Sequence, residues 1–420
     1  MGASETPCAA RAFQSAFISA PAWRRIGALL ALLLATAAAQ PQHSHGTGAK
    51  ARAQLAGGAA FAPDGSLWLT GLNEDGQLFV QSAPATDLQR WGARRVVNTA
   101  GDVISADGEA FPKLTFGPKG WVVITYTQPL AKPYTGMIRM LRSDDGGHSF
   151  SAPFTVHADR QQITHRFEST AFDARGVLHT LWIDKRDMER APKTGKKSSY
   201  QGAAVYRNES GDGGVSFGPD LKLADHSCEC CRIAMAPGSD GVLRAMWRHV
   251  FETGVRDHGF AALLAPDEVH LVRASFDDWR IDACPHHGPG LAPAPGEGFH
   301  AVWFGVRRSA GKEVAGVRYA RLRPDGSPQA DTLRLLPDPA AEHADVLAAG
   351  TRVAIVWRSV QGPTSTLKAW LSADSGRSFA LQVLGQVSGD NDQPRLAQHG
   401  ERMVAVWRNP KQTQVHEIRF

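Results

Sequence analysis

Cysteine and histidine gather in two short segments, and these carry the clearest chemical signal in the chain. Three of the five cysteines lie in segment 226–232 (His-Ser-Cys-Glu-Cys-Cys-Arg), and a fourth opens segment 284–288 (Cys-Pro-His-His-Gly). Thiolate and imidazole groups are ligands that suit Cu(I) and Zn(II). The candidate metal ligands are Cys228, Cys230, Cys231, Cys284, His286 and His287.

Disulfide formation is the competing interpretation of the same cysteines. The fifth cysteine, Cys8, lies in the segment that we expect to be removed on export, so the mature chain would keep four. An exported chain with an even number of cysteines usually oxidises them in pairs. One bridge from Cys284 to the segment 228–231 would join the two segments, whereas a second bridge would have to close within 228–231, where the geometry is cramped. The sequence leaves both interpretations open.

Two carboxylates, Glu168 and Asp184, form the candidate acid/base or nucleophile pair. Glu168 precedes one predicted strand, and Asp184 follows the next. Carboxylates in unlike environments can separate their pKa values, so that one donates a proton while the other stays ionised. Four arginines are candidates for binding an acidic ligand, because a guanidinium fork matches both oxygens of a carboxylate. They are Arg186, Arg248, Arg358 and Arg408.

A long repeat must position these side chains. A turn followed by an alternating strand with an aromatic end recurs, with ends at positions 126, 182, 247, 303, 357 and 407 and a weaker copy ending at 71. The spacings are 55, 56, 65, 56, 54 and 50 residues. This near-constant period, without helical periodicity in the repeat region, predicts an all-β propeller of four-stranded blades. Seven units favour seven blades, the last closed by residues near Ala51–Leu55, and six blades are the alternative.

A second pattern, Ser-x-Asp-x-Gly-x-x-Phe, occurs three times between strand-like runs. Asp and Gly supply turn chemistry there, and Phe supplies an apolar anchor. The copies are Ser143, Asp145, Gly147 and Phe150; Ser210, Asp212, Gly214 and Phe217; and Ser372, Asp374, Gly376 and Phe379. In this pattern the chain, over roughly residues 55–420, resembles the sialidase superfamily of Asp-box (BNR-repeat) β-propellers.

The expected topology brings the candidate groups to one end of the central channel. In each blade the first strand starts on the face where the second strand ends, so the links between blades and the loops after the second strands converge on one channel mouth. The Asp-box turns lie on the opposite face and are interpreted as structural. The two Cys/His segments precede the first strands of the fourth and fifth units, so we expect them to be neighbours.

The resemblance implies an exo-sialidase-like glycoside hydrolase that acts at this mouth, with arginines on the acidic group of the sugar. The chain departs from the family pattern, because it has no Arg-Ile-Pro motif near its start and its last tyrosine is Tyr319, too early for the usual nucleophile. Two alternatives from other classes stay open. One is a non-catalytic propeller that binds glycan or protein, and the other is an exported metal-binding or redox protein.

The N-terminus predicts export. Arg24 and Arg25 precede the apolar run Ile26–Ala39, which ends in small residues before Gln40 and is short for a membrane span. We expect a signal peptide at 1–39, a flexible segment at 40–50 and the propeller at 51–420. The segment before Gln40 carries three arginines and one glutamate, so its removal would lower the net charge of +5 by 2. No basic run resembles a nucleic-acid footprint, and the expected product is a periplasmic or secreted monomer without a transmembrane span.

Overall fold

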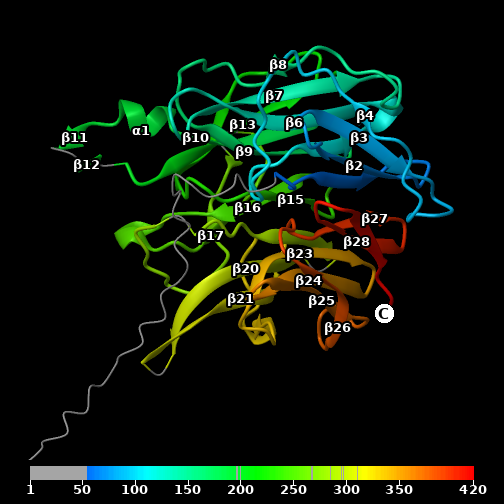
Figure 1. Ribbon diagram of the computed structural model, residues 1–420. Helices are drawn as coiled ribbons and strands as arrows, with labels where there is room; N and C mark the ends of the chain where they lie inside the picture. Colours follow the sequence, from blue (N-terminus) through cyan, green and yellow to red (C-terminus); the bar gives the residue numbers. More distant parts are fainter. Residues whose placement is uncertain are drawn as a thin grey trace, which may run out of the picture. The chain divides into compact units, whose positions relative to one another are not determined.

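The computed structural model describes residues 54–194, 197–198, 200–265, 268–283, 285–294, 296, 298–309 and 311–420. Residues Ala51–Phe420 group as one compact unit. Its strands form seven antiparallel sheets around a ring, which makes the fold a seven-bladed β-propeller (Figure 1). The predicted fold class is confirmed, with seven blades rather than six. The α-helix α1 (Arg186–Arg190) is one turn long, and no helix of the described residues has the length and apolar character to cross a membrane.

Six blades have four strands each, and the seventh has three within the described residues. The first three blades contain β1 (Gly58–Phe61), β2 (Leu67–Leu72), β3 (Leu78–Ala83), β4 (Arg95–Val96); β5 (Lys113–Phe116), β6 (Val122–Pro129), β7 (Gly136–Ser143), β8 (Phe154–Thr155); and β9 (His165–Phe172), β10 (Leu178–Asp184), β13 (Ala203–Ser210), β14 (Leu221–Ser227). The next two contain β15 (Ala234–Pro237), β16 (Leu243–Arg248), β17 (His258–Ala262), β18 (Val272–Arg273); and β19 (Gly290–Ala294), β20 (Gly298–Ser309), β21 (Lys312–Leu322), β22 (Arg334–Leu335). The last two contain β23 (Ala341–Ala349), β24 (Arg352–Gln361), β25 (Thr364–Ser372), β26 (Ala380–Ser388); and β27 (Arg395–His399), β28 (Arg402–Arg408), β29 (Thr413–Glu417). A small pair, β11 (Lys193–Thr194) and β12 (Lys197–Ser198), lies in the loop after β10.

The ring closes between the last blade and the first. The first strand of each blade contacts the first strands of both neighbouring blades, and this order returns from β27 to β1. At the closure, the Arg408 guanidinium donates to the carbonyl oxygens of Leu55, at 3.2 Å, and Leu72, at 2.6 Å. Of the predicted closing strand near Ala51–Leu55, residues 51–53 lie outside the described residues.

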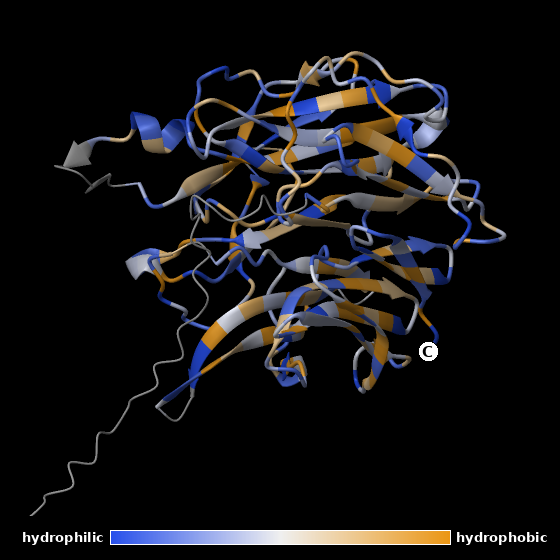
Figure 2. Cartoon of the chain, viewed as in Figure 1, coloured by the Kyte–Doolittle hydropathy of each residue, from blue (hydrophilic) through white to orange (hydrophobic). Residues whose placement is uncertain are grey.

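The aromatic residues that define the repeat pack in the core between blades. Trp182, Trp247, Trp357 and Trp407 are among the largest fully buried side chains, and Tyr126 takes the same place in the second blade. Hydrophobic residues are frequent in the strands, whereas many of the connecting loops are hydrophilic (Figure 2). Burial of these large rings supplies the main driving force for stacking one blade on the next.

Three of the repeat tryptophans donate their indole N–H to a buried carboxylate. The pairs are Trp182 with Asp184, at 2.8 Å; Trp303 with Asp277, at 2.7 Å; and Trp357 with Asp338, at 2.8 Å. A buried indole needs such an acceptor, because an unsatisfied N–H is costly. Asp184 thus takes part in a structural arrangement that recurs around the ring.

Gly71 explains why the first copy of the repeat is weak. A Cβ atom at this position would lie 2.6 Å from a terminal nitrogen of Arg408. Glycine therefore leaves room for the guanidinium that closes the ring, where the other blades carry an aromatic residue.

The three Ser-x-Asp-x-Gly-x-x-Phe segments form the same turn between the third and fourth strands of their blades. In the first, the Ser143 hydroxyl donates to Asp145 at 2.7 Å and accepts from the Gly147 N–H at 2.8 Å. Asp145 also accepts from the N–H and hydroxyl of Ser149, and these hydrogen bonds hold the pKa of Asp145 well below its usual value. The other turns repeat this pattern with Ser210, Asp212, Gly214 and Ser216, and with Ser372, Asp374, Gly376 and Ser378.

Candidate functional site

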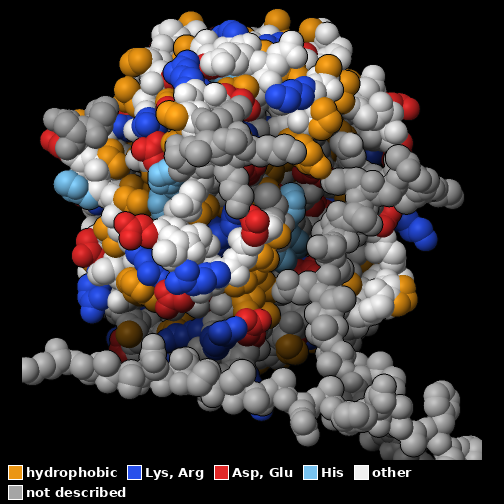
Figure 3. Space-filling model, turned by 90° about the vertical axis from the view of Figure 1, so that its left-hand side faces the viewer, with side chains coloured by type: hydrophobic (Ala, Val, Ile, Leu, Met, Phe, Trp, Pro, Cys, Tyr) orange, Lys and Arg blue, Asp and Glu red, His pale blue; other side chains and the backbone are white. Residues whose placement is uncertain are grey.

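The loops after the second strands and the links between blades emerge at one end of the channel, as the topology predicts. The loop after β10, which carries α1, and the tip of the β20–β21 hairpin project from the same side of the propeller (left in Figure 1). Figure 3 looks onto this side, where basic, acidic and histidine side chains are interspersed. We refer to it as the mouth.

The link between β4 and β5 enters the channel, and residues 104–111 form what we call the plug segment. Most of its residues are buried, and Glu109 is only 2 % exposed. Glu109 accepts hydrogen bonds from the Arg232 guanidinium at 2.8 Å, the Gly288 N–H at 3.1 Å and the His343 ring at 3.1 Å. Since these partners belong to the fourth, fifth and sixth blades and the plug segment leads into the second, Glu109 spans the channel axis.

Charge neutralisation makes this buried carboxylate stable. Burial alone would raise the pKa of Glu109, but the neighbouring Arg232 and His343 hold it well below its ordinary value. Burial lowers the pKa of His343, although its hydrogen bond to Glu109 acts in the opposite direction. The backbone of His343 adopts the left-handed conformation, with φ 51°, where β23 bulges opposite β24. Such strain in a non-glycine residue is typical of positions that the surrounding structure fixes.

Sequence reasoning missed Glu109. No role is predicted for the plug segment from the sequence, although Glu109 precedes the first strand of its blade as the Cys/His segments precede theirs. Arg395 at the start of β27 supports the plug segment, since it donates to the Gly108 carbonyl at 3.0 Å and lies over the Phe111 ring at 4.0 Å. A carboxylate in this recurrent position was the signal that could have identified it.

Glu168 lies on the wall of the channel. Its side chain is fully buried and pairs with the Lys113 ammonium at 3.3 Å and the Thr127 hydroxyl at 2.9 Å. Burial lowers the pKa of Lys113, and the charge of Glu168 opposes this effect. These contacts join the second blade to the third, and the role of Glu168 at the mouth stays a prediction.

Asp184 has a different set of partners. It accepts from the Trp182 indole at 2.8 Å and from the Arg186 backbone N–H and guanidinium at 2.8 and 2.7 Å. Its strand position pairs with His165, whereas Glu168 lies further along β9. Among the described residues Glu168 and Asp184 share no hydrogen-bond partner, and Asp184 and Arg186 form a buried structural pair.

The remaining predicted sugar-binding arginines also have structural partners. Arg248 donates to the carbonyl oxygens of His287, at 3.0 Å, and Phe304, at 2.7 Å, in the neighbouring fifth blade. Arg408 does the same for the first blade, as described above. Arg358 pairs with Glu342 of its own blade at 2.9 Å and donates to the Asn391 carbonyl, ahead of the seventh blade, at 3.2 Å. An arginine after the repeat tryptophan thus ties one blade to the next.

The cysteines of the segment 226–232 form a compact group. Cys228, Cys230 and Cys231 are between 1 % and 4 % exposed, and the sulfur of Cys228 lies 3.7 Å from that of Cys230 and 3.9 Å from that of Cys231. A disulfide would require about 2.05 Å, so no bridge closes within this segment. A hydrogen bond to Cys228 and burial raise the pKa of the Cys231 thiol. Cys284 lies outside the described residues, so its bridge and its place in a metal site stay predictions.

The two predicted histidine ligands do not belong to the thiol group. His287 stacks between the rings of Phe304, at 4.4 Å, and His343, at 4.5 Å, so it faces the plug segment. Burial lowers the pKa of His287 well below its usual value. His286 is exposed. Of the six predicted ligands, the described structure brings three sulfurs together.

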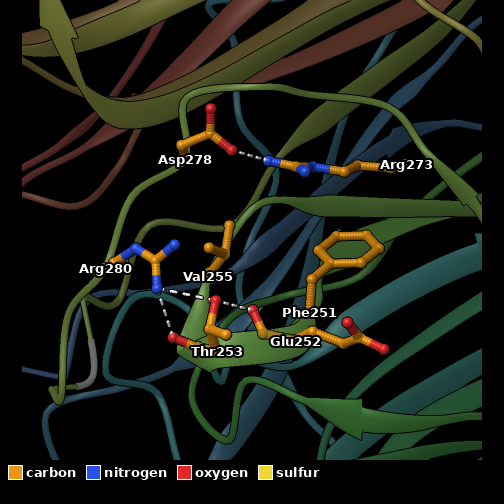
Figure 4. Close-up of a pocket in the computed structure, with 7 residues that line it drawn as sticks. All are labelled: Phe251, Glu252, Thr253, Val255, Arg273, Asp278 and Arg280. Atoms are coloured by element: carbon orange, nitrogen blue, oxygen red, sulfur yellow. Dashed lines mark hydrogen bonds and ion pairs between the residues drawn. The ribbon is translucent and has the colours of Figure 1, made fainter.

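A groove of about 440 Å³ opens on the mouth beside the fourth blade, and we call it the mouth groove (Figure 4). It lies between the loop after β16 and the link after β18, and its lining residues are Phe251, Glu252, Thr253, Val255, Arg273, Asp278 and Arg280. Arg280 donates to the carbonyl and hydroxyl oxygens of Thr253 at 3.0 and 2.8 Å. Arg273 pairs with Asp278 and lies 5.3 Å from the Phe251 ring. The groove thus combines one aromatic ring with groups of both charges.

Comparison with known proteins supports the fold. Neither a protein-family model nor a curated protein sequence matches the chain. Among solved structures, an ulvan lyase of polysaccharide lyase family PL25 superposes with a TM-score of 0.51 at 11 % identity, over 86 % of this chain and 90 % of the lyase. The Hadza microbial sialidase Hz136 gives 0.49 at 13 % identity, over 81 % and 73 % of the two chains. The Penicillium chrysogenum α-L-arabinanase gives 0.47 at 13 %, over 78 % and 92 %. At 11 % identity, the likeness to the lyase concerns the fold alone.

Proposed function

We propose that this chain is an exported, monomeric propeller of the sialidase superfamily kind that binds an acidic glycan at its channel mouth. The observation that carries the proposal is the mouth groove, with an aromatic ring and two arginines around one open space. Binding sites of repeat folds usually lie on loops that a rigid scaffold presents at one end.

The groove has the chemistry that an acidic sugar requires. A sugar ring can pack its C–H face on Phe251, which lines the groove. The exposed Arg280 spends one terminal nitrogen on Thr253, and a guanidinium offers several more N–H donors for a carboxylate or sulfate. Asp278 and Glu252 can accept hydrogen bonds from sugar hydroxyl groups.

The lyase described above adds support from its ligand. Its structure is described as bound to -[GlcA(1-4)Rha3S]-, a unit that carries a carboxylate and a sulfate. The similarity to the lyase concerns the fold, so binding of an acidic glycan by this chain is our hypothesis. The charges that line the mouth groove are consistent with it.

Binding agrees with the geometry better than hydrolysis does. Retaining and inverting glycosidases need two carboxyl groups on either side of the scissile bond. Glu109 and Asp184 each have both oxygens occupied by protein donors. Both oxygens of the buried Glu168 also accept from protein donors, one from the Lys113 ammonium and one from the Thr127 hydroxyl, so hydrolysis is the second candidate.

Calorimetric titration with acidic and neutral oligosaccharides tests the proposal. We expect oligosaccharides that contain glucuronate, sialic acid or sulfate to bind, and their neutral analogues to bind at least about tenfold more weakly, because hydrogen bonds to charged groups contribute about 1.5–3 kcal/mol. Arg280→Ala should weaken binding by at least about tenfold. Arg352→Ala, an arginine paired with Glu401 on the opposite face, is the matched control.

Two results would reject the binding proposal: no titration signal with any acidic oligosaccharide, or equal loss in Arg280→Ala and Arg352→Ala. Hydrolysis is tested separately by the release of reducing ends from the same oligosaccharides. If it occurs, Glu168→Gln should abolish it. Export predicts that the mature protein recovered outside the cytoplasm begins near Gln40.

A further inference from the structure

The three cysteines ahead of the fourth blade form a cluster that glycan binding does not use. Their sulfur atoms all lie within 4.8 Å of one another. Apolar side chains surround them, among them Phe167, Ile233 and Trp247, in one buried cluster. An apolar setting with three convergent sulfurs excludes water and presents a single kind of donor atom.

The spacing of the sulfurs matches that of ligands on one metal ion. Thiolates bind at about 2.3 Å, which separates neighbouring sulfurs by roughly 3.8 Å in a tetrahedral site and roughly 4.0 Å in a trigonal one. The distances from Cys228 to Cys230 and Cys231 are 3.7 and 3.9 Å. Two of the three separations therefore match those of ligands on one ion, and the third is within 4.8 Å.

Positive charge lies beside the sulfurs. A terminal nitrogen of Arg256 donates to the Cys228 sulfur at 3.4 Å. Arg248 is 1 % exposed, its carbonyl accepts from the Cys228 N–H at 2.9 Å, and its Nε has no hydrogen-bond partner within the described residues. N–H donors to ligand sulfurs strengthen metal sites.

We propose that Cys228, Cys230 and Cys231 bind one soft monovalent cation of the Cu(I) type in a three-coordinate site. Soft thiolates select Cu(I) or Zn(II), and structural Zn(II) takes four ligands. Within the described residues, no histidine or carboxylate joins the three sulfurs. Each thiol that is protonated beforehand exchanges its S–H bond for an S–Cu bond and releases the proton to solvent, and no electron is transferred. Three thiolates and one Cu(I) carry a net charge of −2, which the two arginines offset.

Cu(I) titration of the reduced mature protein under anaerobic conditions tests this inference. With bathocuproine disulfonate as the competing chelator, we expect one Cu(I) per chain, and X-ray absorption should show three sulfur neighbours at about 2.3 Å. Cys231→Ser should lower the affinity more than about 100-fold, and Arg256→Met by about 10–100-fold, as for other groups that support metal ligands. Arg244→Met, a partly buried arginine on the opposite face, should leave the affinity unchanged.

Several outcomes would overturn the inference. One is a disulfide to Cys284, detected by mass analysis after alkylation without reduction, in a protein that takes up no Cu(I) after reduction. A Cys231→Ser variant with a native circular dichroism spectrum and wild-type affinity would also reject the site, as would a reduced protein that takes Zn(II) but not Cu(I). Because oligosaccharide binding is measured independently, failure of one proposal does not decide the other.

Discussion

At the scale of single residues, the charged side chains of the mouth divide into two groups. Glu109 and Arg248 bond groups of other blades and so hold blades together, whereas Asp184 is satisfied within its own blade. Arg280 and Phe251 line open space instead. The sequence could identify residue types and their common end of the channel, but not this division, because it depends on which side chains meet across the ring.

Glu109→Gln should destabilise the protein strongly. The substitution removes the negative charge opposite the buried Arg232, and breaking a buried ion pair costs about 3–5 kcal/mol. Urea denaturation monitored by tryptophan fluorescence measures the change. Glu74→Gln, which loses an exposed pair with Arg94, should change the free energy of unfolding by less than about 1 kcal/mol. Equal effects of the two substitutions would contradict the role assigned to Glu109.

The same carboxylate predicts a dependence on pH. The pKa of Glu109 is lower in the folded protein than the value of about 4.3 in an unfolded chain. Its stabilising contribution is therefore complete above that value and is lost as the pH falls below it. The difference in free energy of unfolding between the wild type and Glu109→Gln should be constant from pH 6 to 7 and should narrow between about pH 4 and 3. A difference that grows with acidification would refute this assignment.

At the scale of elements, the turns were predictable because their signals are local. Each Ser-x-Asp-x-Gly-x-x-Phe segment carries its own hydrogen-bond donors and acceptors, and each repeat tryptophan closes a strand of fixed period. The plug segment was not predictable in this way. Its polar contacts join residues more than 100 positions apart, such as Glu109 and Arg232, and no local pattern encodes them.

Ser143→Ala tests the turns. The hydroxyl of Ser143 is buried and accepts from the Gly147 N–H, so its removal leaves a buried donor unsatisfied at a cost of about 1–3 kcal/mol. Ser210→Ala and Ser372→Ala should have similar effects, and the effects should add because the turns lie in different blades. Ser149→Ala, at the exposed end of the turn, should cost less. Oligosaccharide binding should stay unchanged in all four variants, and weaker binding would contradict the structural role.

At the scale of the whole molecule, the propeller is a ring whose ends meet without a covalent link. The period of the repeat gave the number of blades, since seven aromatic or glycine ends correspond to seven sheets. The closure itself depends on one buried arginine at the end of the repeat and one glycine at its beginning. Neither could be matched to the other from sequence, because they are separated by almost the whole propeller.

Arg408→Met should loosen the closure. It leaves the buried carbonyl oxygens of Leu55 and Leu72 without their donor, at a cost of about 1–3 kcal/mol each. Hydrogen exchange should then accelerate in β1 and β27 more than in β15 on the other side of the ring. Arg308→Met, an exposed arginine paired with Glu313 within the fifth blade, should leave the exchange pattern of β1 and β27 unchanged. Uniform acceleration in all blades would show that the closure is not a local weak point.

The position of Glu109 also bears on the side from which a ligand can reach the propeller. Because the Glu109 carboxylate bonds groups of three blades across the axis, the plug segment lies in the channel below the mouth. We therefore expect a ligand to approach and leave from the mouth, and a long polymer to lie across the mouth rather than pass along the channel axis.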